Sequence, residues 1–537
     1  MEALFRSFGP PILADLSPPE TGDVAVPLAM LRWKGESVAD FDLAIIGGGI
    51  NGAGIARDAA GRGFRVVLIE QNDLASGTSS ASSKLIHGGL RYLERRQFGL
   101  VRAALREREI LLRAAPHLIR PLRFVLPINP ARRSAAILRI GLLIYDWIGR
   151  RRILPGTREL DLLTDQAGLP LKARFHHAFE YSDCFADDAR LVVVNAVDAA
   201  ERGAVIRTRT RCVRADRGDV WRLVLNARGQ RDVVTARILV NAAGAWSELF
   251  AETALRAEPK RRLRLDKGSH IVVRRLYDHD RAYILQAADN RVVFAIPFQR
   301  DFTLIGTTDR SFVGDPAVVA ASGEEIDYLC NVVNEYFRSE IGAADVVWTY
   351  AGVRSLYDDG SRKPQDIGRD YALILDERRG EAPLLTVYGG KITTYRRLAE
   401  EVLARLAHFF PRSPAWTART PLPGGDFVYD GVDTLIERTQ RTWRFLTGDH
   451  AHRLVGAYGT RVDRVLGQAT KLDDLGMRFG GDLTAAEVRY LMSSEWAQTA
   501  DDVLWRRSKL GLYFLPPQIK LLEDFMAAAP PAGGAID

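Results

Sequence analysis

The chain has little cysteine for its length. Its 537 residues include Cys184, Cys212 and Cys330, which stand far apart and form no C-x-x-C pair. This scarcity argues against a disulfide-stabilised fold and gives no support to a zinc or iron–sulfur centre, so no metal is expected. A reducing compartment, the cytoplasm, is therefore the expected location.

Long apolar runs are also missing. No stretch of about 18 consecutive apolar residues occurs, so we expect no helix that spans a bilayer. The N-terminus carries Glu2 and Asp15 and lacks a basic region followed by a long apolar core, so it does not resemble a secretory signal. Residues 1–40 contain several prolines and are expected to form a loosely structured extension.

The composition that remains is typical of a soluble globular protein with two or three domains. Hydrophobic residues make up 47% of the chain and charged residues 26%. The net charge of +7 attracts acidic partners, which include phosphorylated substrates, anionic lipid headgroups and nucleic acid. Charge alone does not choose among them.

A glycine cluster follows the first apolar run, between Asp42 and Gly54. Gly47, Gly49 and Gly52 have the G-x-G-x-x-G spacing of a strand, a tight turn and a helix that binds a dinucleotide pyrophosphate. A second apolar run ends in Glu70, about 20 residues on, where a ribose hydroxyl needs an acceptor. The alternative, a βα turn that binds nothing, does not explain an acidic residue at position 70.

A loop rich in serine and threonine, here called the hydroxyl-rich loop, follows at residues 71–93. It could be a solvated linker. Its position directly after the acidic residue instead favours a role at a cofactor, because in a flavin-binding fold small polar residues here line the pyrophosphate and isoalloxazine. The candidates for cofactor contact in this loop are Ser79, Ser83, Lys84, Leu85, His87, Gly88 and Gly89.

Two later segments repeat the pattern of a strand followed by small residues, at 237–247 and 388–396. We expect the first to return beside the dinucleotide. The second opens a helix whose N–H groups would face the pyrimidine side of a reduced flavin, although a plain helix start with threonine caps is the alternative. The candidate cofactor contacts in these segments are Ala243, Gly244, Trp246, Gly390, Lys391 and Thr393.

Taken together, the glycine turn, Glu70 and the run 82–94 resemble FAD-dependent glycerol-3-phosphate dehydrogenases of the aerobic, quinone-linked type. The resemblance covers about residues 40 to 515. Ser355 departs from it, because a proline is expected there, and the N-terminal extension has no counterpart. Further motifs that carry the resemblance lie at 350–354, 367–371, 388–396 and 502–511.

The resemblance implies FAD as cofactor and oxidation of sn-glycerol 3-phosphate to dihydroxyacetone phosphate. Hydride would pass from C2 to flavin N5, and electrons would pass to a membrane quinone. An oxidase that uses dioxygen is one alternative, and a non-catalytic basic flavoprotein that binds membrane or nucleic acid is another. In the leading interpretation nucleic acid is not a partner, and a homodimer is a possible assembly.

The resemblance also assigns roles within the site. His270 is the leading base, with His87 as its competitor, since an imidazole titrates near neutrality. Arginine suits the substrate phosphate because it offers planar, bidentate donors. The expected catalytic residues are His270, Arg354 and Lys391, and the expected substrate contacts are Arg91, Tyr92, His270, Arg354 and Arg369.

The predicted fold is α/β, a Rossmann-type FAD-binding domain with an inserted antiparallel-sheet substrate domain and a C-terminal helical cap. The expected ranges are 1–40 for the extension, 41–430 for the two interleaved domains, with the substrate sheet mainly at 255–370, and 431–525 for the cap.

A basic and apolar segment between Phe98 and Ile153 suggests contact with an anionic membrane surface. Its apolar run from Ile137 to Ile148 is too short to span a bilayer, yet Trp147 and the flanking arginines suit an interfacial helix. An ordinary buried helix with solvated arginines is the alternative. The expected location is therefore cytoplasmic, with peripheral association at the inner face of the membrane.

Overall fold

The structure is a computed structural model. It describes residues 39–94, 96–129, 135–149, 153–258, 263–357, 370–410 and 413–528. The side chains of Arg91 and Glu94 are outside this description, as is nearly all of the expected N-terminal extension.

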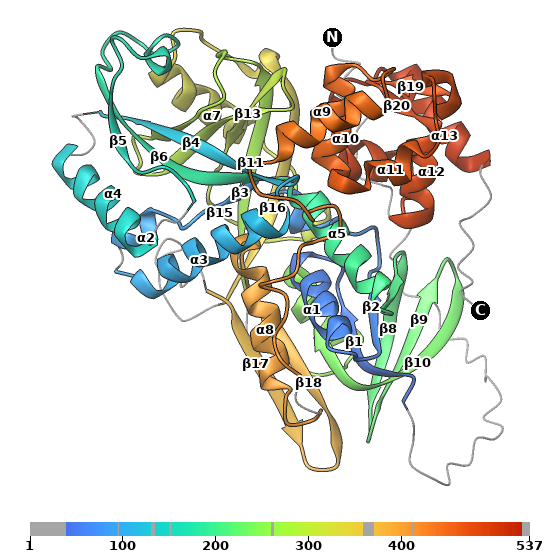
Figure 1. Cartoon of the computed structure of the whole chain (residues 1–537). Helices are drawn as coiled ribbons and strands as arrows, with labels where there is room; N and C mark the ends of the chain where they lie inside the picture. The colour runs from blue at the N-terminus through green and yellow to red at the C-terminus, as the bar shows by residue number, and fades with distance from the viewer. Residues whose placement is uncertain are drawn as a thin grey trace. The chain divides into compact units, whose positions relative to one another are not determined.

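The first sheet has eight strands and surrounds the glycine turn. In chain order they are β1 (Phe41–Ile46), β2 (Val66–Ile69), β7 (Val205–Arg207), β8 (Thr210–Arg217), β9 (Trp221–Ala227), β10 (Gln230–Asn241), β17 (Ala372–Arg378) and β18 (Glu381–Tyr388). They are arranged as β17-β18-β10-β1-β2-β7, and β8 and β9 form a meander with β10 (Figure 1). The strands from β18 to β7 are parallel, so their carboxyl ends meet at one edge, where ligands bind in open α/β sheets.

At its centre, both faces of this sheet are buried. The helices outside the C-terminal region are α1 (Ile50–Gly61), α2 (Arg91–Glu94), α3 (Phe98–Ala114), α4 (Ala135–Gly149), α5 (Asp188–Glu201), α6 (Ser247–Thr253), α7 (Gly323–Tyr336) and α8 (Tyr395–Arg405). On one face Leu43 and Ile45 of β1 join the core formed with α1, α5 and α8, while Ala44 and Ile46 join the core beneath the meander. This double burial explains why β1 is a continuous apolar run.

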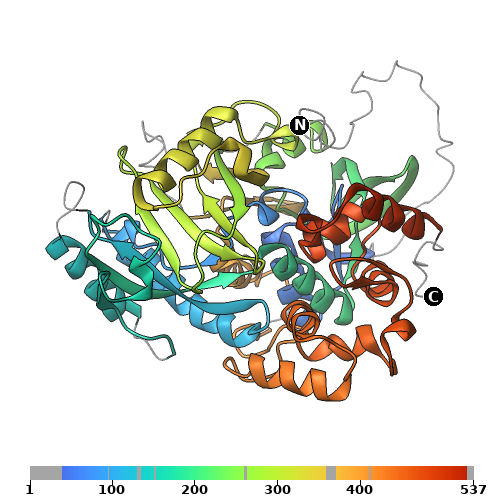
Figure 2. The same cartoon turned by 90° about the horizontal axis from the view of Figure 1, so that it is seen from above.

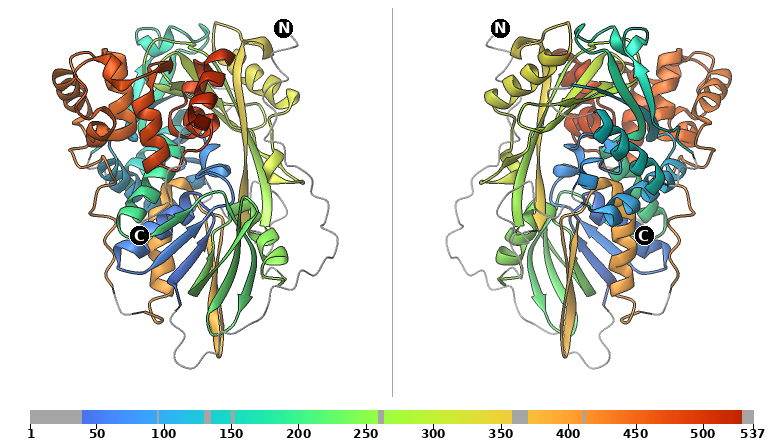
Figure 3. Two further views of the ribbon diagram at one scale, coloured as in Figure 1. Left: turned by 90° about the vertical axis from the view of Figure 1, so that its right-hand side faces the viewer. Right: turned by 90° about the vertical axis from the view of Figure 1, so that its left-hand side faces the viewer.

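The second sheet has ten strands. In chain order they are β3 (Leu85–Ile86), β4 (Ile119–Pro127), β5 (Arg158–Asp161), β6 (His177–Ala186), β11 (Leu263–Arg274), β12 (Ala282–Gln286), β13 (Val292–Phe298), β14 (Phe302–Gly306), β15 (Arg310–Ser311) and β16 (Val346–Tyr357). Their order is β15-β11-β14-β13-β12-β4-β6-β3, with β16 paired to β11 and β5 paired to β6. The long antiparallel strands β11 and β16 run side by side (Figure 3).

Each face of the second sheet has its own helical cover. Ile271 and Val273 pack with α7, whereas Val272 packs in the core that includes α3 and α4. Because successive strand residues point to opposite faces, His270 points to the same face as Val272. This face is the one that the candidate site uses.

The C-terminal region is helical and has its own core. Its elements are α9 (Val432–Thr442), α10 (Gly448–Tyr458), α11 (Val462–Leu466), the short strands β19 (Arg478–Gly480) and β20 (Leu483–Thr484), α12 (Ala485–Ser494), a π-helix η11 (Asp502–Arg507) and α13 (Pro516–Ala528). These elements form one group, orange to red in Figure 2. The predicted α/β architecture, with a second, largely antiparallel sheet and a helical C-terminal region, is confirmed.

Helix α4 has apolar residues on two stripes. Leu138, Leu142 and Tyr145 are buried against the second sheet, whereas the opposite stripe is open to solvent. The exposed members of that stripe are Ile137, Ile140, Leu143, Ile144 and Trp147. Within the described part of the chain, no helix has the length and apolar character needed to cross a bilayer.

Candidate active site

The turn between β1 and α1 forms the first part of the site. Gly47 has a φ of +109°, and a Cβ built on it would lie 2.5 Å from the carbonyl oxygen of Ala242. A Cβ on Gly52 would lie 1.9 Å from the carbonyl oxygen of Gly47, so α1 packs directly on the turn. A Cβ on Gly49 meets a single described atom within 4 Å, Oγ of Ser79 at 3.0 Å. The backbone at Gly49 is thus accessible in the way that a pyrophosphate requires.

Glu70 lies at the end of β2 and is held by backbone donors. Its carboxylate accepts the N–H of Gly48 at 2.7 Å and the N–H of Asn72 at 2.8 Å. Burial raises the pKa of Glu70, and the two backbone donors oppose that shift. The acceptor that the sequence predicts for a ribose hydroxyl is therefore fixed beside the glycine turn.

The end of β10 comes back to the same edge, as the repeated pattern predicts. Cα of Ala243 lies 3.0 Å from a Cβ built on Gly47. Gly244 has a φ of +57° and no described atom within 4 Å of its built Cβ. The ring of Trp246 lies 3.0 Å from a Cβ built on Gly77, so this tryptophan reaches the hydroxyl-rich loop.

The segment after β18 joins the glycine turn to the hydroxyl-rich loop. Nδ2 of Asn51, in the first turn of α1, donates to the carbonyl oxygen of Gly389 at 3.0 Å. Gly390 has a φ of +106°, and its built Cβ would lie 2.7 Å from the same Nδ2. Oγ1 of Thr393 accepts the backbone N–H of His87 at 3.3 Å. Three segments far apart in sequence thus meet at one place.

Lys391 and Tyr92 form a cationic corner beside that place. Nζ of Lys391 lies 3.8 Å from the centroid of the Tyr92 ring, a cation–π contact. The ring packs on Gly89, where a Cβ would lie 2.1 Å from it. The N–H of Gly88 donates to the hydroxyl of Tyr145 at 2.8 Å, which anchors the end of the loop.

Lys84 and Leu85 face the protein interior. Lys84 is 1% exposed, and its Nζ contacts Asp188 at 2.7 Å and the carbonyl oxygen of Ser80 at 3.1 Å. Leu85 is buried in β3, opposite Phe185 of β6. These contacts anchor the hydroxyl-rich loop to the protein interior.

His270 is enclosed on β11. Its Nε2 lies 2.9 Å from Oγ of Ser83, and a Cβ on Gly306 would lie 2.0 Å from the imidazole, so that glycine makes room for the ring. Burial lowers the pKa of His270 well below its usual value, and the charges of Arg354 and Lys84 lower it further. The ring is therefore neutral at physiological pH and can accept a proton.

Arg354 lies on β16 and its guanidinium is oriented by oxygen atoms. Nη1 donates to Asp309 at 3.0 Å and Nη2 to Oγ1 of Thr307 at 3.2 Å, while the side chain stays 28% exposed. A Cβ on Gly268 would lie 2.6 Å from Nη2. The arginine is thus held in place but still reachable.

Strand β16 rests on the hydroxyl-rich loop. Oγ1 of Thr78 donates to the carbonyl oxygen of Val353 at 2.6 Å, and a Cβ on Gly352 would lie 2.8 Å from the methyl group of Ala81. The second sheet therefore presents His270 and Arg354 to the segment that follows the dinucleotide turn.

Two of the expected residues cannot be placed. Arg369 lies outside the described residues, and Arg91 begins α2 with its side chain outside the description. Their assignment to the substrate stays a prediction.

The sequence did not indicate Asn51, Thr307 and Asp309 as site residues. Asn51 had a usable signal, because it is the polar residue inside an otherwise apolar and glycine-rich helix start. Thr307 and Asp309 follow β14 without any distinctive spacing, and the pairing of strands in space brings them to Arg354.

Comparison with known proteins agrees with this geometry. Residues 42–396 match the family model described as FAD dependent oxidoreductase. The chain belongs to the FAD-dependent oxidoreductases. Residues 415–525 match the model for the C-terminal domain of alpha-glycerophosphate oxidase.

The similarity of this FAD-dependent oxidoreductase to individual relatives extends over nearly the whole length of both chains. The chain is 52% identical to a glycerol-3-phosphate dehydrogenase of Pseudomonas aeruginosa, over 91% of this chain and 96% of that protein. It is 49% identical to a D-erythritol 1-phosphate dehydrogenase of Brucella abortus, over 88% and 95%. The glycerol-3-phosphate dehydrogenase structure from Bacillus halodurans, complexed with FAD, is 28% identical with a TM-score of 0.73, and 91% of each chain is covered.

The residues of this FAD-dependent oxidoreductase fit its cofactor. Oδ1 of Asn51 is buried and has no hydrogen-bond partner among the described residues, although it sits where the glycine turn meets Gly390. Apart from Oγ of Ser79, no described atom lies within 4 Å of a Cβ built on Gly49, and none lies within 4 Å of one built on Gly244. The prediction of FAD as cofactor is confirmed by the family.

Proposed function

We propose that the protein oxidises sn-glycerol 3-phosphate to dihydroxyacetone phosphate. One observation carries this proposal: a buried imidazole and an oriented guanidinium lie on paired strands that face the hydroxyl-rich loop. A secondary alcohol that bears a phosphate needs both, a base for its hydroxyl proton and a cation for its dianion. FAD supplies the hydride acceptor when it is bound.

The roles of the substrate-side residues follow from their contacts. We place proton acceptance at Nε2 of His270, because this atom faces Ser83 and the loop. Arg354, oriented by Thr307, binds the phosphate, and Lys391 adds a point charge beside the ring of Tyr92. Arg91 and Arg369 are proposed as further phosphate contacts from the resemblance alone.

The cofactor-side residues divide between the two halves of FAD. Gly47, Gly49 and Gly52 leave the backbone open for the pyrophosphate, and Glu70 accepts from the ribose. The flavin half would lie near Asn51, Gly390 and the end of the hydroxyl-rich loop, where the three segments meet.

An anaerobic spectrum of the purified protein tests the substrate. Addition of sn-glycerol 3-phosphate should bleach the bound flavin, since no oxidant is present to restore it. D-Erythritol 1-phosphate is the decisive comparison, because a relative of similar identity carries that name. Bleaching by the erythritol ester, and not by the glycerol ester, would replace the proposed substrate.

The proposed electron acceptor is a membrane quinone. The support is the exposed apolar stripe of α4, which suits an enzyme that works at a lipid surface. Turnover with a quinone analogue compared with oxygen uptake separates this acceptor from dioxygen.

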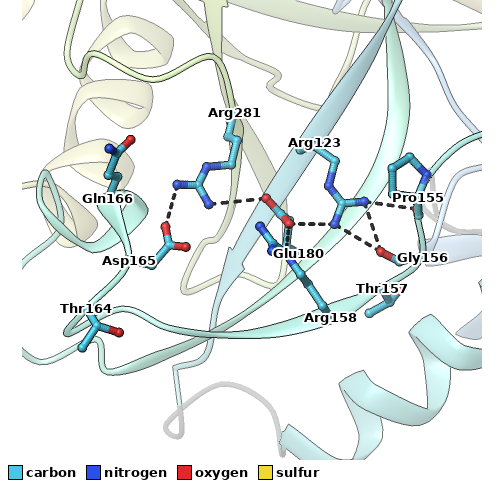
Figure 4. Close-up of a pocket in the computed structure, with 10 residues that line it drawn as sticks. All are labelled: Arg123, Pro155, Gly156, Thr157, Arg158, Thr164, Asp165, Gln166, Glu180 and Arg281. Atoms are coloured by element: carbon cyan, nitrogen blue, oxygen red, sulfur yellow. Dashed lines mark hydrogen bonds and ion pairs between the residues drawn. The ribbon is translucent and has the colours of Figure 1, made fainter.

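A hollow of about 920 Å³ lies beside α4 (Figure 4). Arg123, Arg158 and Arg281 line it around the buried carboxylate of Glu180, and Asp165 also faces it, so the arginines exceed the carboxylates by one. The adjoining Thr157 is tied to α4 by bonds of 2.9 and 3.0 Å to Asp146. A small excess of positive charge thus lies next to the apolar stripe, a combination that favours binding to anionic lipid. Arg132, Arg133 and Arg150–Arg152 lie outside the described residues.

The membrane proposal predicts the effect of removing apolar surface from α4. The double change Ile140→Ser and Trp147→Ser should release the protein from vesicles of phosphatidylcholine mixed with phosphatidylglycerol. Partitioning should fall at least about tenfold, because burying one such side chain is worth roughly 1.5–3 kcal/mol. Val313→Ser is the matched control, since Val313 is 96% exposed on a different surface segment. Unchanged sedimentation of the double variant with vesicles would remove α4 from the interface.

The phosphate proposal predicts a selective loss in Arg354→Ala. Flavin content should stay normal, while kcat/KM for glycerol 3-phosphate falls at least about tenfold, since a charge-assisted hydrogen bond is worth roughly 1.5–3 kcal/mol. Oxidation of unphosphorylated glycerol should change little. Arg310→Ala is the control, because Arg310 is an exposed arginine paired with Glu324. Equal losses for glycerol and its phosphate would take this role from Arg354.

A further inference from the structure

The C-terminal motif at residues 502–511 contains the π-helix η11, which reaches outside its own helical group. π-Helices are rare and occur frequently at functional sites. Side chains of η11 contact both the dinucleotide-side loop and the aromatic residues next to His270.

The first set of contacts consists of ion pairs with the loop after β2, at Asp73, and with Arg209. Nη1 and Nη2 of Arg507 donate to the two carboxylate oxygens of Asp73, each at 2.8 Å, and Nε of Arg506 adds a bond of 2.6 Å. The side chains of Arg507 and Asp73 are 0% and 1% exposed. On the other flank Asp502 pairs with Arg209 at 2.6 Å. Such planar, buried, bidentate pairing fixes geometry more firmly than a point charge can.

The loop after β2 is itself bonded to the glycine turn. The N–H of Ala75, two residues after Asp73, donates to the carbonyl oxygen of Gly48 at 3.0 Å. Leu74 lies against the same glycine, 2.9 Å from its built Cβ. The N–H of Arg209 donates to the carbonyl oxygen of Asn72 at 2.8 Å. The ion pairs that η11 makes with Asp73 and Arg209 therefore hold a loop that is hydrogen-bonded to the glycine turn.

The second set of contacts is a succession of four rings, stacked at each end and tilted by 41° between Trp348 and Tyr350. Trp505 stacks on Trp348 with centroids 4.5 Å apart and planes at 23°. Trp348 lies 4.9 Å from Tyr350, which stacks on His270 at 4.7 Å with planes at 13°. His270 and Tyr350 are directly opposite in the pairing of β11 with β16, and the Tyr350 hydroxyl donates to the carbonyl oxygen of Ser82 at 2.8 Å.

We propose that η11 positions both partners of the reaction: Trp505 holds His270 through Trp348 and Tyr350, and Arg507 holds the cofactor turn through Asp73. The inference rests on the proposed role of His270. Trp505 and Arg507 are positioning residues, because neither touches the reacting atoms. Plain packing between the helical group and the rest of the chain would instead make both contacts contribute to stability alone.

Crossed measurements on two variants separate these possibilities. In Trp505→Leu the flavin reduction rate at saturating substrate should fall about tenfold or more, since small misplacements of a catalytic group are costly. The acidic limb of its pH–rate profile should move to higher pH. Looser packing lets water reach His270 and returns the pKa of that imidazole toward the usual value. FAD affinity should be unchanged, and Trp505→Phe should restore most of the rate.

In Arg507→Lys the pattern should be reversed. The dissociation constant of FAD, measured by titration of the apoprotein, should rise at least about tenfold, because a lysine cannot make two parallel bonds to Asp73. The reduction rate and its pH profile at saturating FAD should match the parent. Matched controls are Trp443→Leu, a tryptophan in the same helical core, and Arg453→Lys, a bidentate pair with Glu487 within that region.

The outcomes are distinguishable. The crossed pattern supports the proposal, whereas equal changes in both quantities for both variants, or changes no larger than in the controls, overturn it. If His270→Ala also reduces its flavin at the parent rate, the proposed function of His270 fails as well. If His270→Ala is slow and Trp505→Leu is normal, the positioning role alone fails.

Discussion

Replacing Gly49 by valine should give a folded protein that purifies without FAD. The built Cβ at this position meets Oγ of Ser79 at 3.0 Å and no other described atom within 4 Å, so a side chain there requires only a small shift of the Ser79 hydroxyl. It would occupy the space through which a pyrophosphate approaches the backbone. Loss of the yellow colour, with an unchanged far-UV circular dichroism spectrum, is the expected result.

Gly99→Val is the matched control for this experiment. Gly99 lies in α3 and has no described atom within 4 Å of its built Cβ, so a side chain there costs little beyond helix propensity. It should retain full flavin. A Gly49→Val protein with full flavin would require the pyrophosphate to lie elsewhere.

His270→Ala should slow flavin reduction by about a hundredfold to ten-thousandfold at saturating substrate, the usual contribution of a general base. Substrate binding should change less, because the base acts as the proton leaves. In the parent, the acidic limb of the pH–rate profile should lie below the usual histidine range. Burial lowers the pKa of His270, so the ring becomes protonated, and inactive as a base, only at lower pH. The variant should lose that limb.

Stopped-flow reduction under anaerobic conditions measures both effects. His408→Ala serves as control, because His408 is an exposed histidine paired with Glu377. Ser83→Ala should have a smaller effect than His270→Ala, since Ser83 orients the imidazole without accepting the proton. Reduction of His270→Ala at the parent rate would leave His87 as the residue to test as the base.

Local patterns in the sequence predicted the strand, turn and helix around the glycine cluster. Gly47, Gly52 and Glu70 have positions that depend on one strand, one turn and one helix, so spacing along the chain is enough to place them. The fold class and FAD are confirmed. The assignments of individual residues to cofactor and substrate stay predictions.

The substrate side depends on contacts between distant segments, which spacing does not reveal. The pair formed by Ser83 and His270 joins residues 187 positions apart, and the contact between Arg354 and Asp309 depends on strand pairing in the second sheet. Strands β3 to β6 enter that sheet from residues 85–186, and no local pattern indicated that they would join β12. The burial that lowers the pKa of His270 likewise exists only in the assembled sheet.

The ion pair between Asp73 and Arg507 also sets an order of events during synthesis. The two residues are 434 positions apart, so at about 5–20 residues per second a ribosome needs roughly 20–90 s to travel from one to the other. Throughout that interval the loop that follows β2 has been made but its carboxylate lacks its partner. A chain that ends before residue 507 never acquires this bond. The loop after β2 therefore gains its ion pair with Arg507 only after the C-terminal region has been synthesised.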